Sequence, residues 1–299
     1  MTQFRTAALI VNARSRKGQR MFEHACARLR ELGLELDGHA VKDPRHLDRV
    51  TRRAIAKKPE LLILGGGDGT VSGLVDHMVG HDIVLGVLPF GTANSFARTL
   101  GIPLDVNGAI DVIVNGERRR IDLGMIDGDY FANAASLGIA PQIAETVPHG
   151  LKKVLGRIGY LSWAALQFAR FRPFWLTIDM GAGPKRLKVV EVRIANGRFH
   201  GGVELMEDAE LDSGEIVVEA VRGHFKRRLV TNWAASVLRL EARRDDVVVF
   251  RGRSIRIDTE PRMPISIDGE VLARTPATAH VAPAIIEVMA PRPEPADAV

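Results

Sequence analysis

Residues 61–70 read Leu-Leu-Ile-Leu-Gly-Gly-Gly-Asp-Gly-Thr, and this stretch decides the fold of the first half of the chain. Four apolar residues in a row, without alternation, are typical of a strand that is buried on both faces of a parallel sheet. The strand pattern ends directly in glycines, and a helical pattern follows over 70–78. Glycines let the backbone approach a ligand and point successive N–H groups into a concavity, which favours phosphate. The stretch therefore predicts a phosphate-binding loop between a strand and a helix.

Similar strand–loop–helix units lie on both sides of this stretch. We expect strands at 5–12, 34–41, 60–64 and 83–88, and helices at 21–32, 45–58 and 70–78. Apolar strands that alternate with helices predict a doubly wound parallel sheet with helices on both faces. The first 124 residues are therefore expected to form an α/β domain.

Beyond residue 124 the pattern changes to short alternating or β-branched runs separated by Gly, Pro and Asp. Strands are expected at 174–180, 188–195, 215–221, 254–258 and 265–268, and two helical blocks at 151–171 and 225–240. Such runs predict a mainly antiparallel β domain over 125–290. Residues 291–299 contain three prolines and are expected to be a frayed tail.

The composition is that of an ordinary globular protein, with 46% hydrophobic and 26% charged residues in 299, which excludes disorder and collagen. The net charge of +5 suits anionic partners such as phosphates or lipid headgroups. The single cysteine, Cys26, excludes internal disulfides and fits a reducing compartment. No stretch approaches the roughly 18 apolar residues that a membrane span needs. We expect a cytoplasmic protein that visits the inner membrane face as a peripheral protein.

Two familiar phosphate loops do not match the glycine stretch. A Walker A loop needs Lys followed by Ser or Thr after its last glycine, and Thr70-Val71 does not fit. This stretch also lacks the third glycine of a dinucleotide-binding fingerprint and the acidic residue that the fingerprint has about 20 positions later. Asp68 would be repelled by phosphate unless a cation lies between them, which suggests Mg²⁺ or a polar network. The alternative is a glycine-rich tight turn without a ligand.

Two further loops are expected at the same edge, because the carboxyl ends of parallel strands meet there. Residues 12–18 are rich in hydrogen-bond donors, and residues 91–98 begin Gly-Thr-Ala-Asn-Ser. Each also has a structural interpretation, since Asn94 or Ser95 is a good helix N-cap and 14–17 reads as a solvated loop. Three such loops at one sheet edge favour a ligand site.

An Asp-Gly pair, Asp268-Gly269, lies between two alternating apolar runs near the end of the chain. This is a strong hairpin signal. A carboxylate at the tip of a turn can also accept the proton of a hydroxyl, so the structural and catalytic interpretations are compatible. The nine histidines are scattered, and His200, beside Gly201-Gly202, either approaches the site or, as we expect, lies at the surface.

Residues 65–70, together with Pro89-Phe90-Gly91-Thr92-Ala93-Asn94, resemble the diacylglycerol kinase catalytic-domain family, which includes bacterial soluble lipid kinases and the sphingosine and ceramide kinases. The resemblance continues in the same order through 121–124, 131–138, 155–160, 195–197 and 267–270. It implies a nucleotide-binding domain similar to those of NAD kinases and phosphofructokinases, followed by a β-sandwich. It further implies ATP and Mg²⁺ as cofactors and phosphorylation of a lipid hydroxyl at the membrane surface, as in phospholipid biosynthesis.

The resemblance also implies roles for individual residues. Those that would hold ATP are Asn12, Ser15, Gly65, Gly66, Gly67, Asp68, Gly69, Thr70, Gly91, Thr92 and Asn94. Asp268 would be the general base and Glu270 its acidic companion, while Asp68 and Asp122 are the candidate metal ligands. This sequence departs from the family in its first loop, where Ala13 and Arg16 replace the usual Pro and Gly. Ser95 and Ser213 also stand where Asp is common, which weakens the case for a structural Mg²⁺ site.

Two other functions remain open from the sequence. An NAD kinase shares the Gly-Gly-Asp-Gly element, and a nucleotide-binding regulatory protein without catalysis would fit the serines at 95 and 213. No nucleic-acid-binding module is visible. Aromatic and basic residues at 152–175 suit either a headgroup-level surface or core packing of a helix. The phosphorylated lipid and the oligomeric state are not specified.

Overall fold

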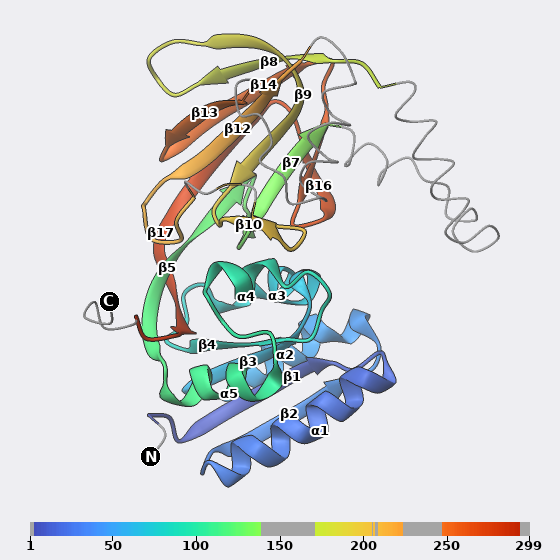
Figure 1. Cartoon of the computed structure of the whole chain (residues 1–299), viewed down its shortest axis with the longest axis vertical. Helices are drawn as coiled ribbons and strands as arrows, with labels where there is room; N and C mark the ends of the chain where they lie inside the picture. The colour runs from blue at the N-terminus through green and yellow to red at the C-terminus, as the bar shows by residue number, and fades with distance from the viewer. Residues whose placement is uncertain (1–2, 139–170, 205, 207–208, 224–246, 294–299) are drawn as a thin grey trace, which may run out of the picture.

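The computed structural model describes residues 3–138, 171–204, 206, 209–223 and 247–293. Within these ranges an α/β part and a β part are stacked along the long axis of the molecule (Figure 1). The helical block expected at 225–240 lies outside the described residues, as does the block at 151–171 except for its last residue. None of the helices in the described ranges is long and apolar enough to cross a bilayer.

Four parallel strands form the sheet of the α/β part, in the order β4–β3–β1–β2. Strand β1 (Thr6–Asn12) pairs with β2 (Glu35–Val41) and β3 (Leu61–Gly66), and β3 pairs with β4 (Val84–Pro89). Every residue of β3 and β4 is buried, which explains why both read as unbroken apolar runs. The predicted parallel sheet is confirmed.

Helices pack on both faces of this sheet. Helix α1 (Arg16–Glu31) contacts β2 and α5 (Val106–Asn115), whereas α2 (Leu47–Ile55) contacts β1 and α3 (Asp68–Val75). The short helix α4 (Ser95–Thr99) contacts α3 and β4. Single 3₁₀ turns, Pro44–His46 and Asp76–Met78, precede α2 and follow α3. The arrangement is the doubly wound α/β fold that the sequence predicts.

The β part is mainly antiparallel. Its strands are β6 (Asp129–Phe131), β7 (Ala134–Gly138), β8 (Phe174–Asp179), β9 (Lys185–Ala195), β10 (Phe199–His200), β11 (Val203–Glu204), β12 (Ile216–Arg222), β13 (Val247–Gly252), β14 (Ser254–Glu260), β15 (Pro264–Ile267) and β16 (Glu270–Arg274). Neighbouring strands in its sheet follow the order β16–β15–β7–β9–β8–β14, so the hairpin β15–β16 lies at one end of this order. The five predicted strands correspond to β8, β9, β12, β14 and β15, and their apolar residues form a second buried core.

Two long strands connect the parts. Strand β5 (Glu117–Ile126) pairs antiparallel with β17 (Ala277–Ala290), and both run from one part into the other (Figure 1). Strand β17 also pairs antiparallel with β14 and then in parallel with β4, where Glu287 lies opposite Val84. The boundary predicted at residue 124 falls inside β5, so paired strands rather than a flexible linker position the two parts.

Candidate active site

The glycine loop lies between β3 and α3. A Cβ atom on Gly66 would come within 2.5 Å of the Thr70 Cβ, so this close turn requires glycine. Gly67 precedes α3, and its carbonyl accepts the N–H groups of Thr70 and Val71 at 2.9 and 3.2 Å. The N-terminus of α3 therefore begins at the loop, where its partial positive charge favours an anion.

A hollow of about 400 Å³ opens beside the glycine loop, a size suited to a small-molecule ligand. It is lined by Asn12, Arg14, Ser15, Lys17, Gly18, Gly66, Gly67 and Phe90. Two of these side chains, Arg14 and Lys17, are exposed cations. The Asn12 amide donates to Thr70 Oγ1 at 3.3 Å, while Ser15 Oγ accepts the Gly18 N–H as the N-cap of α1. The structure thus places the first predicted loop next to the glycine loop.

The third predicted loop, residues 91–94, touches the glycine loop through its backbone. A Cβ on Gly91 would lie 2.4 Å from the Gly67 Cα. Asn94 has a left-handed backbone (φ 51°), its Oδ1 accepts the Gly91 N–H, and its amide donates to the Gly91 carbonyl. The Asn94 side chain therefore holds its own turn, whereas Thr92 is exposed. The roles of both residues in ATP binding stay predictions.

Asp68 connects the glycine loop to α4. Its Oδ1 accepts the N–H of Phe96 at 3.1 Å, so the carboxylate caps the start of this helix. Asp68 itself is the first residue of α3. One carboxylate therefore ties together the amino ends of α3 and α4.

Asp268 lies at the tip of the β15–β16 hairpin, against the α/β part. Positive φ angles at Asp268 and Gly269 (45° and 99°) are those of a type I′ turn. Its two carboxylate oxygens accept the N–H groups of Ala132 and Ala134 at 3.0 and 3.1 Å. The hydroxyl of Ser72, on α3, lies beside the same carboxylate. The hairpin tip thus meets the helix that follows the glycine loop, while Glu270 is exposed at the start of β16.

Burial is the dominant influence on the titration of the groups around this tip. It raises the pKa of Asp268, although the hydrogen bonds to the carboxylate oppose the shift. Burial also raises the pKa of Asp76, with a smaller contribution from the charge of Asp129. For His200, burial lowers the pKa, and the carboxylates of Asp268 and Asp68 act against it. The His200 side chain is partly buried, and it lies near enough to Asp268 and Asp68 for their charges to act on its pKa, which agrees with the alternative that His200 approaches the site.

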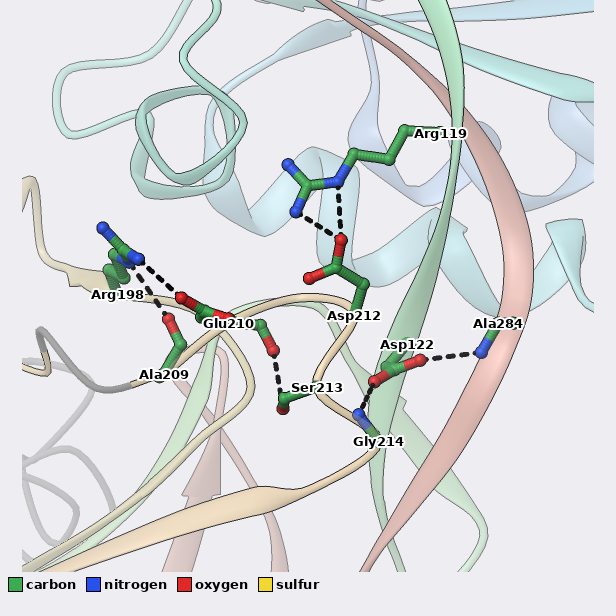
Figure 2. Close-up of polar contacts among 9 residues, drawn as sticks. All are labelled: Arg119, Asp122, Arg198, Ala209, Glu210, Asp212, Ser213, Gly214 and Ala284. Atoms are coloured by element: carbon green, nitrogen blue, oxygen red, sulfur yellow. Dashed lines mark hydrogen bonds and ion pairs between the residues drawn. The ribbon is translucent and has the colours of Figure 1, made fainter. Parts of the chain in front are cut away.

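Asp122 is 3% exposed on β5, and both of its carboxylate oxygens have backbone partners (Figure 2). Oδ2 accepts the N–H of Gly214 and Oδ1 that of Ala284, each at 2.7 Å. In the part of the chain that the structure describes, no group of three or more His, Cys, Asp or Glu is arranged to hold a metal ion. The predicted role of Asp122 as a metal ligand gains no support from this geometry and stays a prediction.

The loop next to Asp122, residues 209–214, is held by two guanidinium groups (Figure 2). Arg198 donates to the Ala209 carbonyl at 3.3 Å and to the Glu210 carboxylate at 3.0 Å. Arg119 donates to the Asp212 carboxylate at 2.6 and 3.1 Å. The Ser213 hydroxyl donates to the Glu210 carbonyl. Positive charge at this loop is therefore supplied by the chain itself.

The described end of the aromatic–basic segment contains both buried and exposed aromatic side chains. Phe171 and Phe174 are buried and meet edge to face, with ring centroids 6.4 Å apart. Trp175 is exposed, and the Arg186 guanidinium lies 4.7 Å from its ring centroid. The rest of the segment lies outside the described residues.

Two family models match this chain. "Diacylglycerol kinase catalytic domain" matches residues 6–126, and "YegS C-terminal NAD kinase beta sandwich-like domain" matches residues 133–290. A Bacillus subtilis (strain 168) protein named "Diacylglycerol kinase" is 29% identical over 88% of this chain and 89% of its own length. A Chromohalobacter salexigens protein named "Probable lipid kinase YegS-like" is 30% identical over 88% and 86%.

Solved structures show the same fold. A crystal structure of a diacylglycerol kinase from Bacillus anthracis str. Sterne superposes with a TM-score of 0.75 at 20% identity, covering 97% of this chain and 98% of that one.

Replacement of Asp122 by Ala is expected to lower the free energy of unfolding by about 2 kcal/mol, because the N–H groups of Gly214 and Ala284, in two partly buried hydrogen bonds, lose their acceptor. Since protein groups occupy both carboxylate oxygens, we also expect EDTA or Mg²⁺ to shift the Tm of the nucleotide-free protein by about 1 °C or less. Thermal and urea unfolding test both expectations. Asp111→Ala, at an exposed carboxylate on α5, is the control. A large Tm gain on adding Mg²⁺ that disappears in Asp122→Ala would instead support metal binding by Asp122.

Proposed function

Since the chain belongs to the bacterial diacylglycerol and lipid kinase family, we propose that it transfers the γ-phosphoryl group of ATP to the hydroxyl of a membrane lipid through Asp268 and the glycine loop. The observation that carries this assignment is the contact between the hairpin tip and α3. It puts a partly buried carboxylate beside the helix that starts at the phosphate-binding loop. Phosphoryl transfer needs these two elements close together, because donor and acceptor oxygens are in line through one phosphorus atom.

The donor side is the hollow beside residues 65–70. Backbone N–H groups at the start of α3 and the cations Arg14 and Lys17 suit a triphosphate. Asp68 is the one candidate metal ligand at this loop, and Mg²⁺ commonly binds proteins through one or two carboxylates plus substrate phosphates. This donor set fits a nucleotide-bound Mg²⁺, which would neutralise charge on the phosphate oxygens.

On the acceptor side, the ionised Asp268 takes the proton of the lipid hydroxyl while the hydroxyl oxygen attacks the γ-phosphorus of ATP. The two N–H bonds from Ala132 and Ala134 fix the orientation of this carboxylate. Burial makes it a stronger base than an aspartate in water. Exposed Glu270 follows on the same hairpin and is proposed as its acidic companion.

A lipid acceptor places the protein at a membrane surface. The net charge of +5 and the exposed Trp175 with its neighbouring cations are consistent with peripheral binding to anionic headgroups. We propose the cytoplasm as its compartment, with access to the inner membrane face.

The decisive assay is transfer of label from ATP to a total lipid extract in mixed micelles, run in parallel with NAD as acceptor. Label in NAD alone would favour an NAD kinase, and ATP binding without transfer to any acceptor would favour a regulatory protein.

Replacement of Asp268 by Asn is expected to lower kcat at least about 100-fold, because an amide cannot accept the hydroxyl proton. One of the two bracketing N–H groups loses its acceptor, which lowers stability, whereas removal of a partly buried charge raises it. The net change in the free energy of unfolding is therefore expected to stay within about 1 kcal/mol. Asp179→Asn is the matched control, since Asp179 also accepts a backbone N–H at a turn but lies on β8. Wild-type turnover in Asp268→Asn would reject Asp268 as the base.

The pH dependence of kcat/KM follows from the raised pKa of Asp268. Activity is expected to fall as the pH drops through that pKa, so the acid limb lies above the ordinary aspartate value of about 3.9. The free energy of unfolding is expected to change with pH in the opposite direction to the activity. The stabilising contribution of the Asp268 carboxyl is present below its pKa in the unfolded chain and is lost as the pH rises through its pKa in the folded protein. Rates and urea unfolding measured from pH 4 to 8 test both, and an acid limb at the ordinary aspartate value would contradict the assignment.

Replacement of Lys17 by Met is expected to weaken ATP binding about 10-fold, through loss of one charge-assisted contact to phosphate. Lys17 is exposed, so the Tm is expected to stay unchanged. Calorimetric titration with ATP and Mg²⁺ measures the Kd. Lys57→Met removes an exposed lysine that pairs with Asp37 and serves as the control. Equal ATP affinity in Lys17→Met and Lys57→Met would show that the first loop, residues 12–18, does not contribute to nucleotide binding.

A further inference from the structure

The segment 196–202 links the two sides of the proposed site. At its start, the N–H groups of Asn196 and Gly197 donate to the Asn133 carbonyl at 2.9 and 3.1 Å. Asn133 lies between Ala132 and Ala134, the two residues whose N–H groups hold the Asp268 carboxylate. This end of the segment is thus fixed to the structure that orients the proposed base.

The other end of the segment is fixed to α4. Ser95 Oγ accepts the N–H of Gly202 at 3.0 Å, and Thr99 Oγ1 accepts that of Phe199 at 3.4 Å. Gly202 has a φ of 84°, and a Cβ there would lie 3.1 Å from the Ala93 Cα, so the backbones are in close contact. Strand β10 accordingly lies directly over α4 (Figure 1). Because Asp68 caps α4, this end is tied to the glycine loop.

His200 lies in the middle of this segment. Its imidazole is partly buried, and the negative charges of Asp268 and Asp68, one from each side of the site, both act to raise its pKa against the effect of burial. The charges of Arg193 and Glu191, which pair with each other at 3.0 Å, also act on this pKa. Because burial lowers the pKa of His200, the ring is neutral near pH 7 and carries one N–H donor.

Resting on the proposed function, we propose that His200 is a further catalytic residue, whose imidazole N–H donates a hydrogen bond to the phosphoryl group during transfer. Phosphoryl oxygens between Asp68 and Asp268 would be repelled by two carboxylates. The N–H of His200, in the segment that links the two sides of the site, offsets that repulsion as a hydrogen-bond donor. In the transfer step, the acceptor O–H bond breaks and its proton goes to Asp268. The new O–P bond forms as the γ-phosphorus bond to the bridging oxygen breaks, and that electron pair leaves on ADP. His200 keeps its proton throughout.

Ser95 acts through His200 and is a positioning residue. Its hydroxyl is the acceptor that holds Gly202, two residues after His200, on α4. Ser95 is 2% exposed and therefore has no access to a lipid. Loss of this hydroxyl is expected to loosen the placement of His200 without removing any group that contacts substrate.

The test compares His200→Phe, His200→Gln, Ser95→Ala and Ser95→Thr by kcat, by KM for ATP and lipid in mixed micelles, and by Tm. His200→Phe is expected to lower kcat about 100-fold with KM for ATP changed less than about 3-fold, the size expected for one transition-state donor. His200→Gln retains a donor and should recover kcat to within about 10-fold of wild type. Ser95→Ala should lose about 10-fold in kcat, and Ser95→Thr should restore it. His280→Gln, on β17, is the control.

A kcat for His200→Phe within about 3-fold of wild type would overturn the role of His200. So would equal losses in His200→Phe and His200→Gln that follow a fall in Tm, since this would indicate a structural role. If His200→Phe does not fold, Ser95→Ala with undiminished kcat overturns the proposal. Absence of lipid phosphorylation by the unaltered protein is a different result, and it would reject the proposed function itself.

Discussion

The antiparallel pairing of β5 with β17 fixes where the two parts of the chain meet. The pairing shifts register between Ala282 and Ile286, and there the Asp122 carboxylate accepts the N–H of Ala284. The same residue holds Gly214 through its other oxygen and accepts the Asn196 amide through its carbonyl. A buried carboxylate is stable only when its hydrogen bonds are complete. One residue therefore ties the irregularity in β17, the loop 209–214 and the start of the segment 196–202 to a single strand.

Asp268 shows how the same groups serve both folding and chemistry. Its two N–H partners favour the ionised form, while burial disfavours it, and burial is the larger effect. The N–H groups come from Ala132 and Ala134, on the chain segment that pairs with β15. The carboxylate is thus oriented by the sheet without being fully neutralised by a cation. A base that is held in place and is more basic than a free aspartate suits proton removal from an alcohol.

Local sequence was sufficient for the features whose cause is local. Unbroken apolar runs predicted β3 and β4, and the Asp268-Gly269 pair predicted a hairpin tip. The return of β17 to the first sheet was not predicted, because its pairing with β4 joins residues about 200 positions apart, and no local pattern encodes such a pairing. His200 was expected at the surface for the same reason. Two residues after His200, the chain is held by the hydrogen bond between Gly202 and Ser95, which are 107 residues apart.

The two serines at positions where relatives often carry aspartate have definite partners here. Ser95 Oγ accepts the Gly202 N–H, and Ser213 Oγ donates to the Glu210 carbonyl. A carboxylate at 213 could not donate that bond, and it would add negative charge beside Asp122. The loop instead has two arginine pairs, at Glu210 and Asp212, which neutralise its own carboxylates. These two exposed carboxylates thus have cationic partners within the chain, and the Asp122 carboxylate is held by backbone N–H groups.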